Sequence, residues 1–153
     1  LDKLKEMGGQ LNVGKNFVEI SPSTLKGVKI ETAPFPGFPT DVQAQMVALL
    51  TQVDGNSFVK ENIFENRFMH VPELMRLGAQ ITQEGKAVFI EGPSKLVAAP
   101  VMCTDLRASA ALVLAALCAQ GETVVDRIYH LERGYEKLTA KLQGLGADIV
   151  KVD

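Results

Sequence analysis

Residues 71–81, Val-Pro-Glu-Leu-Met-Arg-Leu-Gly-Ala-Gln-Ile, have the pattern of a short amphipathic helix that stops at glycine and leads into an apolar strand. The pattern recurs as Leu-Asp-Lys-Leu-Lys-Glu-Met-Gly-Gly-Gln-Leu (1–11) and as Leu-Thr-Ala-Lys-Leu-Gln-Gly-Leu-Gly-Ala-Asp-Ile (138–149). A glycine just after a helix takes the left-handed conformation that ends it. Three glycines, spaced by about 70 residues, mark this helix end: Gly8, Gly78 and Gly146. The chain therefore contains an internal repeat.

A second set of matches falls between these glycines. Thr-Asp-Val-Gln-Ala (40–44) corresponds to Thr-Asp-Leu-Arg-Ala (104–108), and each stands at the start of an apolar helical stretch. The downstream spacing is also conserved between the two copies, with 12 positions from Gly55 to Arg67 and 12 from Gly121 to Arg133. Each unit is predicted to contain strand, helix, strand, helix, strand and strand.

The individual elements follow from β-branched enrichment between turn residues and from helical periodicity. Strands are predicted at 10–14, 17–21, 26–32, 56–63, 80–84, 86–91, 96–103, 122–129 and 147–152. Helices are predicted at 1–8, 41–53, 68–77, 105–120 and 132–143. The 105–120 helix is apolar on nearly every face, so we expect protein all around it. The 132–143 helix carries several charges and should meet water on one side.

The repeat predicts an α/β (α+β) fold of β-α-β-α-β-β units, with buried helices and outer sheets. We expect residues 1–153 to form a partial domain: 1–22 would end one repeat, 23–92 would be a complete repeat, and 93–153 a second, unfinished one. The first residue is not Met, and the start resembles a cut. An exposed strand edge or a missing partner segment should result.

Composition narrows the functional classes. The 153 residues are 46% hydrophobic and 22% charged, which is typical of a folded domain. The net charge of −2 argues against binding to a nucleic acid or an anionic membrane through a broad basic surface. No apolar run reaches the roughly 18 residues of a spanning helix, and the N-terminus is no signal peptide. Cys103 and Cys118 are too few for a disulfide framework, which fits a reduced cytoplasm; Cys118 is expected to be buried.

The stretch Thr-Ala-Pro-Phe-Pro-Gly-Phe-Pro-Thr-Asp (32–41) is the first candidate site. Its prolines and glycine force an ordered, non-helical approach to the helix that follows. Asp41 then has two interpretations, a helix cap, which propensity alone favours, or a carboxylate available as a base or as an acceptor for sugar hydroxyls. Asp105, its partner in the repeat, has the same two interpretations.

The second candidate site is the charged segment 61–70 with its equivalent 126–133. Four arginines could gather there and clamp a phosphate or carboxylate: Arg67, Arg107, Arg127 and Arg133. Surface ion pairs with Glu65 and Glu132 are the alternative. His70 and His130 receive no role. No GxGxxG, Walker, HExxH, CxxC or GxSxG motif is present, so neither a metal nor a cofactor is predicted.

Four stretches together are distinctive: Pro-Gly-Phe-Pro-Thr-Asp-Val-Gln-Ala-Gln (36–45), Phe-Glu-Asn-Arg-Phe-Met-His-Val-Pro-Glu-Leu (64–74), Thr-Asp-Leu-Arg-Ala-Ser-Ala-Ala-Leu-Val (104–113) and Asp-Arg-Ile-Tyr-His-Leu-Glu-Arg-Gly-Tyr-Glu (126–136). Over essentially the whole chain, the sequence closely resembles the C-terminal part of the UDP-N-acetylglucosamine enolpyruvyl transferases (1-carboxyvinyltransferases). The resemblance implies an inside-out α/β barrel built from three β-α-β-α-β-β units per domain.

The resemblance also implies a reaction, the transfer of the enolpyruvyl group of phosphoenolpyruvate to the 3-hydroxyl of UDP-N-acetylglucosamine, with release of phosphate, in peptidoglycan synthesis. It implies that Asp41 contacts that hydroxyl and acts as its base, and that Asp105 assists proton handling. Ile63 and Phe64 would lie against the nucleotide sugar. The phosphoenolpyruvate anion would be held by arginines, namely Arg133 together with Arg67 and Arg107.

Parts of the family pattern are absent from these residues. The catalytic cysteine loop, the phosphoenolpyruvate lysine and most of the uridine pocket have no counterpart, and neither Cys103 nor Cys118 matches the catalytic cysteine. The expected partner is therefore the missing N-terminal part of the same chain, and residues 1–153 alone should be inactive. Two alternatives remain, the related enolpyruvylshikimate phosphate synthase, against which the stretch Phe-Glu-Asn-Arg-Phe-Met-His argues, and a binding module without catalysis.

Overall fold

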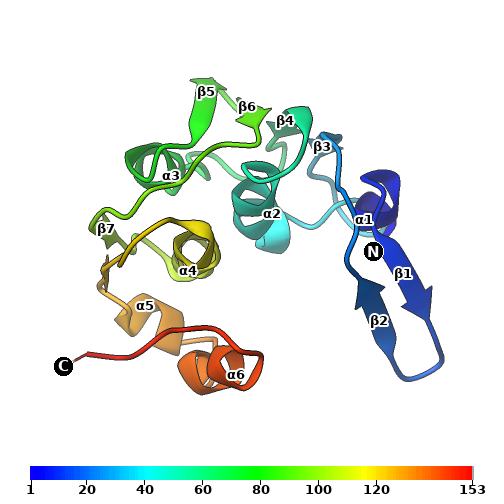
Figure 1. The fold of residues 1–153 in the computed structure, drawn as a ribbon. Helices are drawn as coiled ribbons and strands as arrows, with labels where there is room; N and C mark the ends of the chain where they lie inside the picture. The colour runs from blue at the N-terminus through cyan, green and yellow to red at the C-terminus, as the bar shows by residue number, and fades with distance from the viewer. Residues whose placement is uncertain (153) are drawn as a thin grey trace.

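The computed structural model describes residues 1–152 (Figure 1). In chain order the elements are α1 (Asp2–Glu6), β1 (Gln10–Val13), β2 (Val18–Ser21), β3 (Lys29–Glu31), the 3-10 turn η1 (Thr40–Val42), α2 (Gln43–Leu50), β4 (Gly55–Lys60), α3 (Val71–Arg76), β5 (Gln80–Glu84), β6 (Ala87–Gly92), β7 (Val101–Met102), α4 (Leu106–Cys118), β8 (Val125–Asp126), α5 (Tyr129–Glu132) and α6 (Leu138–Gly144). Among the described residues, no helix is long and apolar enough to cross a membrane.

A four-stranded sheet organises the first half of the chain. Its strand order is β3-β4-β6-β5, with β3 parallel to β4 and the other pairs antiparallel. Between β3 and β6 the elements follow the predicted β-α-β-α-β-β order. The repeat boundaries at 22/23 and 92/93 stay a prediction.

One face of this sheet is buried and the other is open. Ile30, Val59, Val88 and Ile90 are fully buried, whereas Phe89 on the opposite face is 43% exposed. This alternation is the period of two that a half-buried strand requires. The buried face lies against α2 and α3, with the sheet outside them (Figure 1).

The core lies where α2 and α4 pack together behind the sheet (Figure 1). Val47 and Leu50 of α2 and Ala111 and Leu112 of α4 belong to one buried cluster and have no exposed surface. The helices are inside and the sheet is outside, as the repeat predicted. This packing brings Arg107, in the first turn of α4, close to Asp41 in η1, just before α2.

The prediction that the 105–120 helix is enclosed on all sides is wrong in part. α4 buries one side, but Leu114 and Leu117 are 42% and 39% exposed, and Cys118 is exposed as well. The prediction of a buried Cys118 is therefore wrong. No described residue covers this side of α4, so an apolar sequence did not produce burial there.

The second half of the chain departs further from the predicted elements. The 132–143 helix is interrupted: α5 ends at Glu132, and α6 begins only after Lys137, which has a left-handed φ of 49°. The strands predicted at 96–103 and 122–129 shrink to β7 and β8, which pair only with each other. Residues 147–152 form no strand. A strand needs a hydrogen-bonded neighbour, and no described segment supplies one there.

The predicted helix ends at glycine are confirmed. Gly8, Gly78 and Gly146 follow α1, α3 and α6 with φ values of 98°, 101° and 92°, in the left-handed region.

The hairpin of β1 and β2 extends away from the rest of the chain (Figure 1), and every residue of β2 is exposed. The expectation of an exposed strand edge is met by this two-stranded sheet.

Candidate functional site

The proline-rich loop places Asp41 at the entrance to α2. Ala33 N–H donates to the Phe38 carbonyl at 3.0 Å, which closes the loop on itself. Any side chain at Gly37 would put its Cβ 2.5 Å from the Cβ of Ala33, so the tight approach requires glycine. The chain then enters η1, and Asp41 stands in the middle of that turn.

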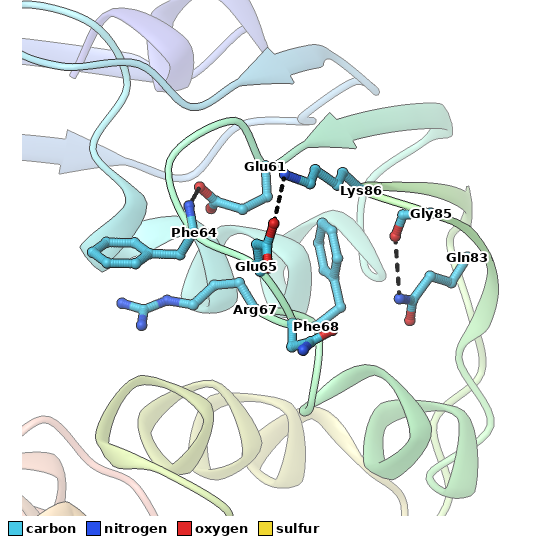
Figure 2. A pocket seen from close by; sticks show the side chains of 9 residues that line it. Glu61, Phe64, Glu65, Arg67, Phe68, Gln83, Gly85 and Lys86 are labelled. Atoms are coloured by element: carbon cyan, nitrogen blue, oxygen red, sulfur yellow. Dashed lines mark hydrogen bonds and ion pairs between the residues drawn. The ribbon is translucent and has the colours of Figure 1, made fainter.

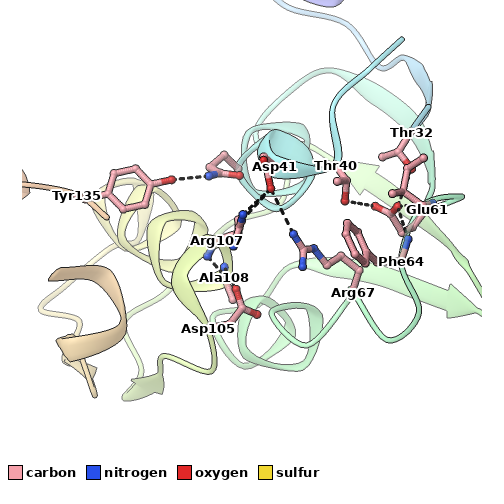
Figure 3. Close-up of polar contacts among 12 residues, drawn as sticks. Thr32, Thr40, Asp41, Glu61, Phe64, Arg67, Asp105, Arg107, Ala108 and Tyr135 are labelled. Carbon is pink, nitrogen blue, oxygen red and sulfur yellow. Dashed lines mark hydrogen bonds and ion pairs between the residues drawn. The ribbon is translucent and has the colours of Figure 1, made fainter. Parts of the chain in front are cut away.

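Asp41 is not a helix cap, so the interpretation that propensity favoured is wrong for this residue. Neither η1 nor α2 receives a hydrogen bond from a capping side chain. The Asp41 carboxylate is 63% exposed, and its Oδ1 accepts hydrogen bonds from Arg107 Nε at 3.0 Å and Nη2 at 2.7 Å (Figure 3). Arg67 Nη2 approaches the same oxygen at 3.5 Å. The site is thus a carboxylate held between two guanidinium groups.

Asp105 does act as a cap. Its Oδ1 accepts the backbone N–H of Arg107 at 2.8 Å and of Ala108 at 3.0 Å, which satisfies two free donors at the start of α4 (Figure 3). The cap fixes the first turn of α4, and Arg107 projects from this turn toward Asp41. The two Thr-Asp pairs of the repeat therefore have different roles in one cluster.

Two of the four predicted arginines converge, and two do not. Arg67 and Arg107 meet at Asp41, and the Arg67 guanidinium lies 4.8 Å from the centroid of the Phe64 ring. Arg127 and Arg133 form no ion pair among the described residues. The predicted alternative of pairs with Glu65 and Glu132 is wrong, because those carboxylates pair with lysines, Lys86 at 3.7 Å and Lys151 respectively.

Glu61 lies at the start of the predicted segment 61–70, but no role was predicted for it from the sequence. Its carboxylate is buried, with 1% of the residue exposed, and it accepts four hydrogen bonds. Oε1 accepts from Thr32 Oγ1 at 2.7 Å and from the N–H of Ile63 and Phe64 at 2.8 and 3.1 Å. Oε2 accepts from Thr40 Oγ1 at 2.9 Å (Figure 3). Burial raises the pKa of Glu61, but these hydrogen bonds outweigh burial and leave the pKa below its usual value.

The turn after Glu61 presents its side chains outward. The backbone N–H groups of Ile63 and Phe64 donate to the Glu61 side chain rather than to a neighbouring strand. β4 therefore ends at Lys60, three residues earlier than predicted. Ile63 is 38% exposed and Phe64 is 50% exposed. Beside them lies a hollow of about 260 Å³ between this turn and the β5–β6 connection, lined by Phe64, Glu65, Arg67, Gln83, Lys86 and their neighbours (Figure 2).

His70 is buried and neutral rather than an acid–base group of the cluster. It is 1% exposed, and its Nε2 has no hydrogen-bond partner among the described residues. Burial lowers the pKa of His70 to about 4, with Asp105 raising it and Arg67 lowering it. His130 lies against the Tyr129 ring. Within residues 1–152, no group of three or more His, Cys, Asp or Glu side chains could hold a metal ion.

Comparison with known proteins shows the family of this chain. The model of the EPSP synthase (3-phosphoshikimate 1-carboxyvinyltransferase) family matches residues 1–142. The chain belongs to this family of enolpyruvyl transferases. Among solved structures, the enolpyruvyl transferase NikO from Streptomyces tendae superposes with a TM-score of 0.88 at 34% identity, over 96% of this chain and 34% of that one. The predicted fold of buried helices and outer sheets, an inside-out α/β barrel left incomplete here, is confirmed.

Curated relatives are more similar still. The chain is 57% identical to the UDP-N-acetylglucosamine 1-carboxyvinyltransferase of Geotalea uraniireducens and 54% identical to that of Shewanella frigidimarina, over 98% and 99% of its own length. It spans only 36% and 37% of those relatives. An EPSP synthase from Acinetobacter baumannii shares the fold, with a TM-score of 0.66, at 20% identity over 99% of this chain and 36% of that one.

Proposed function

We propose that this chain forms part of the active site that transfers the enolpyruvyl group of phosphoenolpyruvate to the 3-hydroxyl of UDP-N-acetylglucosamine. The observation that carries the proposal is the exposed Asp41 carboxylate between Arg67 and Arg107, in a chain 53–57% identical to relatives named for this transfer. The reaction would belong to peptidoglycan synthesis. Two free cysteines, Cys103 and Cys118, agree with a reducing cytoplasm.

Asp41 is proposed as the base. The sugar 3-hydroxyl adds to the carbon of phosphoenolpyruvate that carries the phosphate and loses its proton, while the double bond opens and the adjacent methylene carbon takes up a proton. The carbon–oxygen bond to phosphate then breaks, the resulting methyl group gives a proton back, the double bond forms again and phosphate leaves. A carboxylate on an ordered loop can accept that proton, and the 63% exposure of Asp41 leaves it accessible to a substrate. Asp105 would assist proton handling through its Oδ2, because its Oδ1 is committed to the cap.

Arg67 and Arg107 are proposed to hold the phosphoenolpyruvate anion. In this structure both guanidinium groups share one oxygen of Asp41, so they already point to a common anion position. Positive charge at this point would stabilise the departing phosphate. Arg133 would join them when the nucleotide sugar and the rest of the protein are present. Ile63 and Phe64, exposed on their turn, would lie against the nucleotide sugar.

The test uses the full-length transferase that carries residues 1–153. Phosphate release is measured with phosphoenolpyruvate and either UDP-N-acetylglucosamine or shikimate 3-phosphate. The proposal predicts release with the nucleotide sugar and none above background with shikimate 3-phosphate. The reverse preference would favour the enolpyruvylshikimate phosphate synthase alternative. Binding of both substrates without any release would favour a binding module.

A further inference from the structure

Glu61 connects three segments that are far apart in the sequence. Thr32 follows β3, Thr40 ends the proline-rich loop next to Asp41, and Ile63 and Phe64 form the turn after β4. Figure 3 shows the Glu61 carboxylate between Thr40 on one side and the Phe64 backbone on the other. One buried side chain therefore bonds to both segments that carry the proposed base and the proposed sugar contacts.

The repeat provides an internal comparison for Glu61. Gly55 precedes Glu61 by six positions, and Gly121 precedes Arg127 by the same six, so Arg127 occupies the equivalent place. Both glycines are left-handed, with φ values of 86° and 98°, which supports this alignment. Arg127 is exposed, and its side chain makes no hydrogen bond among the described residues. A buried acid at this place is therefore not required by the repeating fold.

A buried carboxylate without a cation is costly unless its oxygens are filled by donors. The four donors of Glu61 come from the segments on either side of the cluster rather than from the hydrophobic core. On the basis of the function proposed above, we propose that Glu61 is a positioning residue, which holds Asp41, through Thr40, at a fixed place relative to the Ile63–Phe64 turn. The base and the sugar surface then keep the separation that proton removal requires.

The sharpest test removes a single hydroxyl. In the full-length transferase carrying this segment, Thr40→Val keeps the side-chain shape but deletes the bond to Glu61. We expect kcat to fall about tenfold or more while the KM for the nucleotide sugar changes less than about twofold. Thr40→Ser, which keeps the hydroxyl, should restore kcat. Thr82→Val, at an exposed position of β5, is the matched control and should leave both constants unchanged.

A double-mutant cycle shows whether Thr40 acts through Asp41. If it does, Thr40→Val should cost less than about twofold in an enzyme that already carries Asp41→Asn, because the group to be positioned is gone. The proposal would be overturned if Thr40→Val lowered kcat by the same factor in the Asp41→Asn enzyme as in the unsubstituted one. A normal kcat in Thr40→Val alone would also overturn it. Glu61→Ala should lower kcat at least as far as Thr40→Val; if it fails to fold, the Thr40 variants still decide.

The two proposals fail in different ways. An unsubstituted full-length protein that releases no phosphate would refute the proposed function. An active unsubstituted protein whose Thr40 and Glu61 variants are folded and equally active would refute only the role of Glu61.

Discussion

At the residue scale, Asp41 and Asp105 show what a local pattern can and cannot establish. Both follow threonine at the start of a helical stretch, and capping propensity is the same for each. Only the fold separates them, because Arg107 reaches Asp41 from a helix 66 positions further along the chain. The sequence could therefore predict the residues of the cluster but not their pairing. Glu61 lay within a predicted site segment but received no role, because a glutamate near a strand end gives no sign that it is buried.

The exchange of Arg107 for lysine tests the proposed anion site. Arg107 makes two hydrogen bonds to one carboxylate oxygen through Nε and Nη2, and lysine cannot reproduce that geometry. In the full-length transferase, Arg107→Lys should lower kcat/KM for phosphoenolpyruvate by about 10- to 100-fold. Arg76→Lys, at an exposed arginine paired with Glu73, is the control and should have no such effect. Equal kcat/KM values in the two variants would contradict the anion role of Arg107.

His70 should show a strongly lowered pKa. Burial favours the neutral ring, so we expect its NMR resonance, assigned with His70→Gln, to titrate near pH 4 rather than 6.5. Between these values the unfolded chain binds a proton that the folded chain does not. The free energy of unfolding should therefore be highest above pH 6.5. It should decrease by roughly 3 kcal/mol in total as the pH falls from 6.5 to 4. A midpoint near 6.5 would mean that the ring is solvated.

At the element scale, the features with a local cause were predicted correctly. Helix ends at Gly8, Gly78 and Gly146 depend on glycine conformation, which the sequence shows directly. The four strands of the main sheet were also predicted, because their alternating residues and their turns lie within one continuous segment, but their order in the sheet was not. The strand expected at 147–152 failed for a non-local reason, since a strand forms only beside a partner. The exposed side of α4 also has a non-local cause, because no described residue packs against it.

The helix-ending glycines give a matched pair of variants. Gly78 has a φ of 101°, and an added Cβ would lie 3.1 Å from the Lys95 carbonyl oxygen. Gly78→Ala should therefore lower the free energy of unfolding by about 1–2 kcal/mol. Gly144 lies within α6 in open space, so Gly144→Ala should stabilise or leave the free energy unchanged. Denaturant titration measures both, and an equal effect in the two variants would contradict the left-handed turn.

At the scale of the whole molecule, the two copies of the repeat are unequally built. The first has a four-stranded sheet over two helices, whereas the second has only the paired β7 and β8 beside α4. The cluster at Asp41 draws on both, with the loop and the 61–67 turn from one copy and Arg107 from the other. Among the described residues Arg133 forms no hydrogen bond or ion pair with this cluster, so the proposed anion site contains only Arg67 and Arg107 here.

Residues 1–153 produced alone should therefore show no transferase activity. The proposed anion site lacks Arg133, and the relatives are nearly three times as long. A coupled phosphate assay with both substrates measures this, with the full-length transferase as the positive control. Phosphate release by the 153-residue polypeptide would contradict the expectation.

The proposed role of Asp41 is tested most directly by Asp41→Asn in the full-length transferase, with turnover and nucleotide-sugar affinity measured on the same preparation. Asparagine keeps the shape and can still accept a hydrogen bond, but it cannot take the hydroxyl proton. We predict a loss of about 10²- to 10⁴-fold in kcat, with the Kd for UDP-N-acetylglucosamine changed less than about threefold. Normal turnover in the variant, or a loss of binding that accounts for the whole loss of activity, would contradict the base role.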